Sequence, residues 1–257
     1  MTRMKSMKSK VALGSAAAVV AGGLAFAGFA GAESHDDAAS HGPITFEITV
    51  ENLSGPDAIT TSAGTAVPNP LSPPVWAVYR GTNPLFTAYR RADQGTARIA
   101  EDGFPEKKVK MLSRTRRVSS SGVILQEGGP LGPAFEPGSS ATAEITARDG
   151  DWFQFEAMFV QSNDYFYALG GDGIPLFSPD GTPISGDVTK YVNVWDAGTE
   201  LDEEPGNGRF QKPNQGPEQT NYGPSTREPV VPQANTGDPW EIPSPTDLIK
   251  ITITPKG

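Results

Sequence analysis

Residues 44–52 read ITFEITVEN, and this stretch decides the fold class. Every second residue from Ile44 to Val50 is apolar, and polar residues lie between them. That alternation is typical of a strand with one face on a core and one face in water, as in an antiparallel sheet. Residues 249–254, IKITIT, repeat the pattern near the other end of the chain. We therefore expect one domain whose first and last strands pair or lie near each other.

The middle of the chain predicts further strands joined by tight turns. Residues 152–160, WFQFEAMFV, are apolar on both faces, which indicates a central, well-buried strand. The preceding residues, 148–151, read RDGD and contain an Asp-Gly turn pair. We expect a hairpin there, which folds residues 141–147 back along the buried strand.

One short helix and one long loop complete the prediction. The helix is expected over residues 93–101, where Asp93 can cap its start and Gly103 can end it. Residues 205–239 carry seven prolines and five glycines, which predicts a long loop. With about eight strands, the predicted fold is an all-β, antiparallel β-sandwich.

The first 32 residues have the pattern of an export signal. Four basic residues precede an uncharged, small-apolar run from Val11 to Ala30, and Ala30-Gly31-Ala32 is an A-x-A cleavage site. An uncleaved membrane anchor is the alternative, because the run is long enough to span a bilayer. Residues 33–42 are expected to be a flexible tail, and 43–256 the folded domain. With cleavage near Ala32 the protein would be secreted, periplasmic or at the cell surface, without a membrane span.

Composition limits the chemistry. The 257 residues include no cysteine, which excludes disulfides, thiolate ligands and a cysteine nucleophile. The two histidines, His35 and His41, lie in the predicted tail, and no G-x-S-x-G motif is present, so nucleophilic catalysis has little support. Without the signal the chain has 17 basic and 30 acidic residues, a net charge of −13. That charge argues against nucleic acid as a partner and suits a divalent cation better.

Two aspartates follow strand-like runs directly. Asp164 comes shortly after the buried strand, and Asp196 follows the run Tyr191–Trp195. They can be metal ligands, a catalytic carboxylate pair, or turn caps. Ca²⁺ takes six to eight oxygen ligands, which strand-end loops supply without a contiguous motif. We expect a cation site with Asp164, Asp196 and a third ligand, Glu144, which the predicted hairpin would bring to the same sheet end.

Five segments also occur in the order found in the spondin N-terminal domain. They are residues 46–54 (FEITVENLS), 71–78 (LSPPVWAV), 99–103 (IAEDG), 158–166 (MFVQSNDYF) and 195–200 (WDAGTE). The chain thus resembles this domain of F-spondin and mindin, in its bacterial exported branch, over about residues 43–254. Animal members also carry disulfides and often thrombospondin repeats, which this chain lacks, so their integrin, lipopolysaccharide and matrix binding is not carried over.

The resemblance implies an eight-stranded sandwich similar to C2 domains, with one bound Ca²⁺ ion. The family's two aspartate ligands fall on Asp164 and Asp196, and its glutamate falls on Glu144 if the turn after it differs by one residue. No catalytic residue and no other cofactor is implied.

The predicted function is an exported calcium-binding adhesive or ligand-binding module at the cell surface or in the extracellular space. Its partner is expected to be an extracellular protein, a glycan or a lipid headgroup. Two alternatives remain open: a carboxylate-based extracellular hydrolase, and a purely structural surface protein with a stabilising ion.

Overall fold

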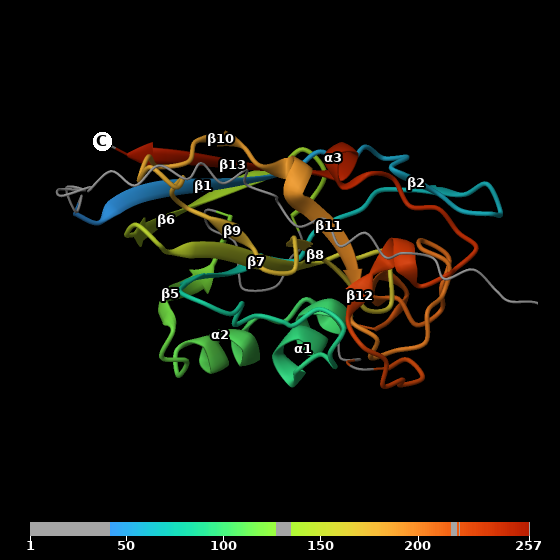
Figure 1. Ribbon diagram of the computed structural model, residues 1–257. Coiled ribbons are helices and arrows are strands. Elements are labelled where there is room, and N and C mark those ends of the chain that lie inside the picture. The colour runs from blue at the N-terminus through green and yellow to red at the C-terminus, as the bar shows by residue number, and fades with distance from the viewer. Residues whose placement is uncertain (1–41, 127–134, 217–219, 221, 257) are drawn as a thin grey trace, which may run out of the picture. The chain divides into compact units, whose positions relative to one another are not determined.

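The structure of this chain is a computed structural model, which describes residues 42–126, 135–216, 220 and 222–256. The predicted signal at 1–32, and all of the predicted tail except Gly42, lie outside the described residues. Two antiparallel sheets and a layer of helices are stacked on one another (Figure 1). Within the described ranges, no helix is both long enough and apolar enough to cross a membrane.

Strand β1 (Ile44–Asn52) lies inside the smaller sheet, whose strand order is β10-β13-β1-β6. The other members are β6 (Ser140–Ala147), β10 (Gly186–Asp187) and β13 (Ile249–Lys256). Phe46, Ile48 and Val50 are each at most 1% exposed, so the predicted alternation of β1 is confirmed. The last strand, β13, pairs antiparallel with β1, as the matching patterns predicted.

The larger sheet has the order β12-β11-β8-β7-β4-β5, and β9 pairs with β7. Its members are β4 (Val75–Tyr79), β5 (Val118–Val123), β7 (Trp152–Met158), β8 (Tyr165–Leu169), β9 (Ile174–Pro175), β11 (Val192–Asp196) and β12 (Val231–Pro232). Phe153 and Phe155 of β7 belong to the core between the two sheets. Glu156 is buried and accepts a hydrogen bond from a helix residue, Thr96. β7 is therefore the well-buried strand that the sequence predicted.

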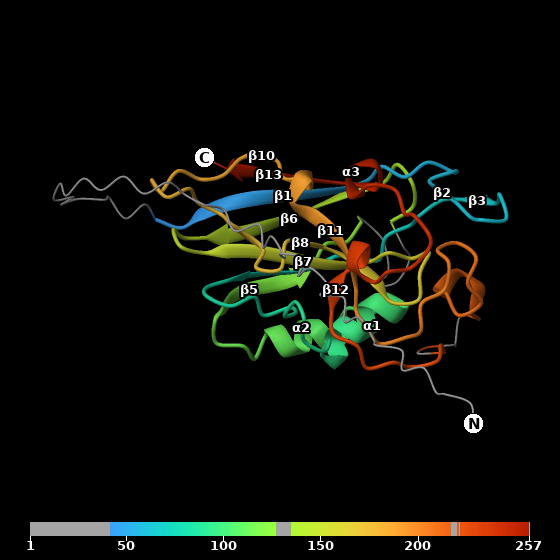
Figure 2. The ribbon, with the colours of Figure 1, turned by 45° about the vertical axis from the view of Figure 1, so that its right-hand side comes forward.

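Two helices, α1 (Gln94–Asp102) and α2 (Glu106–Leu112), cover the other face of the larger sheet (Figure 2). The Asp93 side chain accepts hydrogen bonds from the N–H groups of Gly95 and Thr96, and Gly103 has the left-handed φ of 73°. The predicted helix is confirmed with both of its caps. The second helix, α2, was not predicted, because its seven residues bury only Lys108 and Leu112 and show no apolar stripe.

The remaining elements are short. They are the hairpin β2 (Ile59–Thr60) and β3 (Ala66–Val67), helix α3 (Pro245–Leu248), and 3₁₀ turns at Thr189–Tyr191, Lys212–Asn214 and Gln233–Asn235. Eight of the thirteen strands in the described ranges have five or more residues. The predicted all-β, antiparallel sandwich is therefore confirmed.

The predicted hairpin between β6 and β7 is wrong. The turn itself is present, with the Asp151 N–H donating to the Arg148 carbonyl at 2.9 Å. However, β6 pairs with β1, whereas β7 pairs with β4, β8 and β9. The turn thus carries the chain from one sheet to the other. The Asp-Gly pair specifies a chain reversal, but the choice of sheet for the next strand depends on packing.

Candidate cation site

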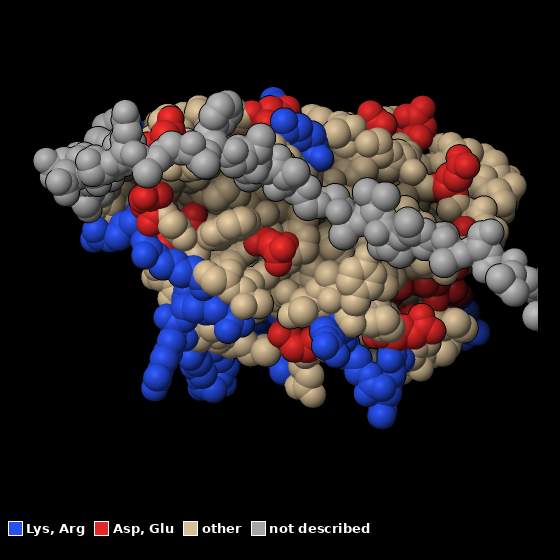
Figure 3. Space-filling view, in the orientation of Figure 1, with Lys and Arg blue, Asp and Glu red and all other residues tan. Residues whose placement is uncertain are grey.

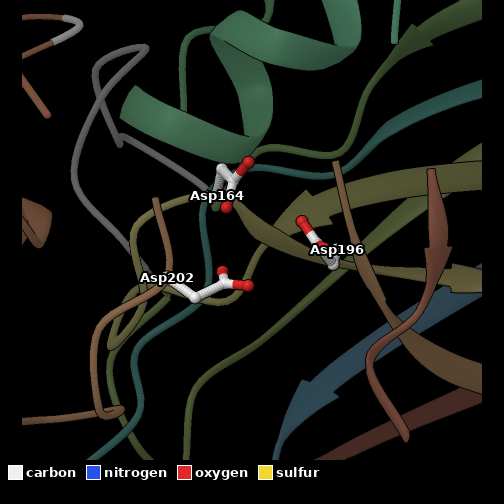
Figure 4. Close-up of side chains that lie close together, drawn as sticks. All are labelled: Asp164, Asp196 and Asp202. Atoms are coloured by element: carbon white, nitrogen blue, oxygen red, sulfur yellow. The ribbon is translucent and has the colours of Figure 1, made fainter. Parts of the chain in front are cut away.

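Three aspartates converge at one end of the larger sheet (Figure 4). Asp164 lies between β7 and β8, Asp196 ends β11, and Asp202 lies in the loop that follows β11. One carboxylate oxygen from each residue can be chosen so that all three lie within 4.8 Å of one another. The antiparallel pairing of β8 and β11 places Asp196 opposite Tyr165, so the first two aspartates are brought together by sheet register.

Asp164 is fully buried, and its two carboxylate oxygens have different surroundings. Oδ2 accepts hydrogen bonds from the N–H groups of Thr199 at 2.6 Å and Glu200 at 3.0 Å, and from the Thr199 hydroxyl at 3.0 Å. Oδ1 is buried and has no hydrogen-bond partner in the described part of the chain. A buried polar atom without a partner costs about 1–3 kcal/mol. A cation bound at Asp164 Oδ1 would therefore stabilise the fold.

Asp196 is 2% exposed, and its Oδ1 accepts a hydrogen bond from the Gly198 N–H at 2.6 Å. This is a turn-capping contact, so capping and ligation are compatible roles for Asp196. Gly198 adopts a φ of 65°, and a Cβ there would lie 2.7 Å from the Glu228 carbonyl, so the turn requires glycine.

Asp202 is the third member of the cluster, and the sequence analysis missed it. Its Oδ1 is buried without a partner among the described residues, like that of Asp164. The available signal was the acid-rich segment Glu200–Glu204, which begins four residues after the strand-end Asp196. A fourth carboxylate, Asp238, accepts a hydrogen bond from the Tyr165 hydroxyl at 3.1 Å and helps to raise the pKa of Asp202.

Burial disfavours the ionised forms of all three aspartates, and the charges of neighbouring carboxylates add to this effect. Burial, with the charge of Asp164, raises the pKa of Asp196 to about 8. Burial and the charges of Asp196 and Asp164 raise the pKa of Asp202 to about 9. The pKa of Asp164 is raised by burial, despite its three hydrogen bonds. The ion pairs within the described ranges include none of the three residues, so no Lys or Arg there neutralises them.

Glu144 does not belong to this cluster, so its predicted place beside Asp164 is wrong. It is exposed on β6 and lies opposite Glu47 of β1 in the smaller sheet. Its charge helps to raise the pKa of Lys256, whose Nζ contacts Glu47 at 2.8 Å. The error follows from the hairpin prediction, because β6 and β7 do not share a sheet. The structure brings together Asp164 and Asp196 and supplies Asp202 as the third carboxylate.

The donor atoms of this cluster are all oxygens, which suits a hard divalent cation. Such an ion would satisfy the unpartnered oxygens and favour the ionised carboxylates. A scan of protein-family models finds no match to this chain, and a search of curated proteins finds no match either. The resemblance to the spondin N-terminal domain therefore rests on the sequence motifs alone.

Proposed function

We propose that this protein is an exported, non-catalytic module that binds Ca²⁺ and, with it, a ligand at the cell surface or in the extracellular space. The observation that supports it most is the convergence of three aspartates within 4.8 Å, with buried, unpartnered oxygens on Asp164 and Asp202. Main-chain carbonyls and water would complete the six to eight oxygen ligands of Ca²⁺. The predicted export signal fits this ion, since extracellular calcium modules work with dissociation constants of about 10⁻⁴–10⁻³ M.

A cavity lined in part by residues that follow Asp202 and Asp238 in the sequence supports the ligand-binding half of the proposal. Its volume is about 500 Å³, within the usual range for small-ligand sites. It is lined by Ile59, Thr60, Thr61, Ser62, Glu204, Pro205, Pro239, Trp240 and Glu241. Glu204 lies two residues after Asp202, and Trp240 two residues after Asp238. An ion held near Asp202 and Asp238 would therefore position two walls of the cavity.

The lining favours an uncharged, hydroxyl-rich ligand, and among the expected partners we propose a neutral glycan. No Lys or Arg lines the cavity, which disfavours a lipid phosphate. Trp240 offers an aromatic face, and the hydroxyls of Thr60 and Ser62 can exchange hydrogen bonds with a sugar. The exposed basic residues of α2 and of the turn after it do not line the cavity. Figure 3 shows basic side chains gathered at the lower left of the molecule, where α2 lies in Figure 1.

A carboxylate-based hydrolase receives less support. Hydrolysis of a glycoside needs an acid that keeps its proton near neutral pH. In the cavity, hydrogen bonds from Ser62 and Asn207 lower the pKa of Glu204, which makes it a poor proton donor. The carboxyls with raised pKa values in the described residues do not line the cavity; they are Glu101, Glu156, Asp164, Asp196, Glu200 and Asp202.

The test is a glycan array probed with purified protein in CaCl2 and in chelator. The wild type is expected to bind neutral glycans only with Ca²⁺. Trp240→Ala should lose the glycan but keep Ca²⁺ binding in calorimetry, whereas Asp202→Asn should lose both. Glu144→Gln is the matched control and should keep both, because Glu144 lies in the other sheet. Glycan binding that chelator leaves unchanged would overturn the proposal.

A further inference from the structure

A second group of buried carboxylates lies beside the aspartate cluster. Glu101 and Asp102 are the last two residues of α1, and Glu200 lies in the loop after β11. They are 4%, 5% and 3% exposed. The Thr199 hydroxyl contacts both Glu101 and Asp164 Oδ2, which connects the two groups. None of these three residues is part of the aspartate cluster itself.

Among the described residues, Asp102 is the one member of this group that forms ion pairs. Asp102 Oδ2 contacts Arg98 at 2.5 Å, and its Oδ1 contacts Lys212 at 3.4 Å. Glu101 and Glu200 appear in no ion pair of the described residues. Asp102 thus engages two basic side chains; the charge of Arg98 also lowers the pKa of Glu101, but neither Glu101 nor Glu200 forms an ion pair in the described residues.

Glu101 and Glu200 each keep one oxygen without any partner. The Gly223 N–H donates to Glu200 Oε1 at 2.9 Å, but Glu200 Oε2 is buried and has no hydrogen-bond partner in the described ranges. Glu101 Oε2 is in the same state, although its carboxyl contacts Thr199. Native structures rarely leave such atoms unpaired unless an unplaced ion or water satisfies them.

The electrostatic potential at Glu101 and Glu200 is negative. Glu101 lies in the last turn of α1, where the helix dipole disfavours a carboxylate. Burial raises the pKa of Glu101 and of Glu200 to about 7, against hydrogen bonds that lower them. The charges of Asp102 and Asp164 raise both pKa values further, and the charge of Glu101 adds to that of Glu200. Glu200 directly follows Thr199, whose hydroxyl contacts Glu101, so the chain brings the two glutamates to the same part of the molecule.

One divalent ion at the aspartate cluster would not compensate this charge. Its two positive charges would meet the three of Asp164, Asp196 and Asp202, and the two glutamates would stay uncompensated. We propose that Glu101 and Glu200 hold a second hard divalent cation beside the aspartate cluster, with water and main-chain carbonyls as its other ligands. This site goes beyond the proposed function and does not require a glycan ligand.

The test counts bound ions. Native mass spectrometry of the full-length protein in CaCl2 is expected to show two Ca²⁺ ions. The double variant Glu101→Gln/Glu200→Gln should retain one, Asp202→Asn should retain the other, and Glu144→Gln should bind two. Anomalous scattering from Mn²⁺ in wild-type crystals would place each ion independently, which covers a double variant that fails to fold.

The outcomes separate this inference from the proposed function. One ion in the wild type, lost in Asp202→Asn but not in the double variant, overturns the second site and leaves the first intact. One ion with the reverse pattern overturns the aspartate site and keeps the glutamate site. Two ions that survive in the double variant, or none in the wild type, refute the glutamate site.

Discussion

Replacing Asp196 by Asn removes one negative charge from the cation site and keeps its shape. The amide oxygen of Asn can still accept the Gly198 N–H bond, which Asp196 Oδ1 accepts at 2.6 Å. In chelator, the variant is expected to be more stable than the wild type. The reason is that a carboxylate disfavoured by burial and by Asp164 is exchanged for a neutral group.

The size of the effect follows from the pKa of Asp196, which is raised from 3.8 to about 8. One unit of displacement corresponds to about 1.4 kcal/mol, so the raised pKa opposes folding by about 5 kcal/mol at pH 8. The titrations of the neighbouring acids are coupled to that of Asp196, so replacing Asp196 by Asn recovers only part of this free energy. We expect a gain of about 2–4 kcal/mol in chelator, which corresponds to at least about 4 °C in Tm.

With Ca²⁺ the difference in stability between the two proteins should shrink. The wild type gains about 3 kcal/mol when free Ca²⁺ is a hundred times the dissociation constant. The variant should gain much less, because one of three carboxylate ligands is missing. The variant's lead of about 2–4 kcal/mol in chelator should therefore largely disappear in Ca²⁺, which a purely turn-capping Asp196 would not produce.

The assay is thermal unfolding at pH 8, followed by circular dichroism, in chelator and in excess CaCl2. Glu144→Gln, at an exposed position of β6, should match the wild type in both. The reasoning fails if Asp196→Asn melts below the wild type in chelator, or if it keeps the full Ca²⁺-dependent rise in Tm.

Three further predictions concern pH, a buried cation and a glycine. Without cation, the folded-state pKa of Asp202, about 9, lies above its ordinary 3.8, so the folded chain binds the extra proton. Urea titrations in chelator should therefore show stability falling from pH 5 to pH 8, and no fall with saturating Ca²⁺. Lys108 is fully buried, and its Nζ lies 2.8 Å from Asp93 and 3.9 Å from the fully buried Glu156. Lys108→Met leaves the Glu156 carboxylate without this cation, so it should cost about 3–5 kcal/mol in the same titration; a loss under 1 kcal/mol would contradict it. Gly198→Ala should cost more than about 1 kcal/mol and weaken Ca²⁺ binding in calorimetry, because its Cβ would lie 2.7 Å from the Glu228 carbonyl; an unchanged Tm would refute this.

The parts of the fold that could be predicted from sequence depend on local interactions. The alternation in β1 is set by side chains two residues apart, and the structure buries Phe46, Ile48 and Val50 as expected. Helix α1 begins at a cap and ends at a glycine that lie within one residue of its ends. In both cases the information lies within about ten residues, so no knowledge of the packing was needed.

The parts that failed depend on contacts between distant segments. The predicted position of Glu144 depended on β6 pairing with β7. The turn at 148–151 is present, but it does not determine which sheet β6 joins. Asp202 joins the cluster because the loop after β11 folds back, with Thr199 and Glu200 donating hydrogen bonds to Asp164. No residue near Asp202 in the sequence indicates that fold-back.

The position of the cluster also bears on what the cation does for the chain. Asp202 stands at the beginning of the long segment that returns to the site at Asp238, and the charge of Asp238 helps to raise the pKa of both Asp196 and Asp202. Within this segment, the Glu203 carboxylate accepts hydrogen bonds from the N–H groups of Arg209 and Phe210, so part of it has its own order. An ion bound by Asp164, Asp196 and Asp202 would fix the beginning of the segment to the sheet. The free energy of ion binding would then offset part of the entropy cost of closing a loop this long, which favours the return of its end. The same ion that stabilises the fold would thus set the distance between Glu204 and Trp240 across the cavity. Stabilisation and ligand binding are then two consequences of one binding event, and a variant that uncouples them, such as Trp240→Ala, separates the two roles.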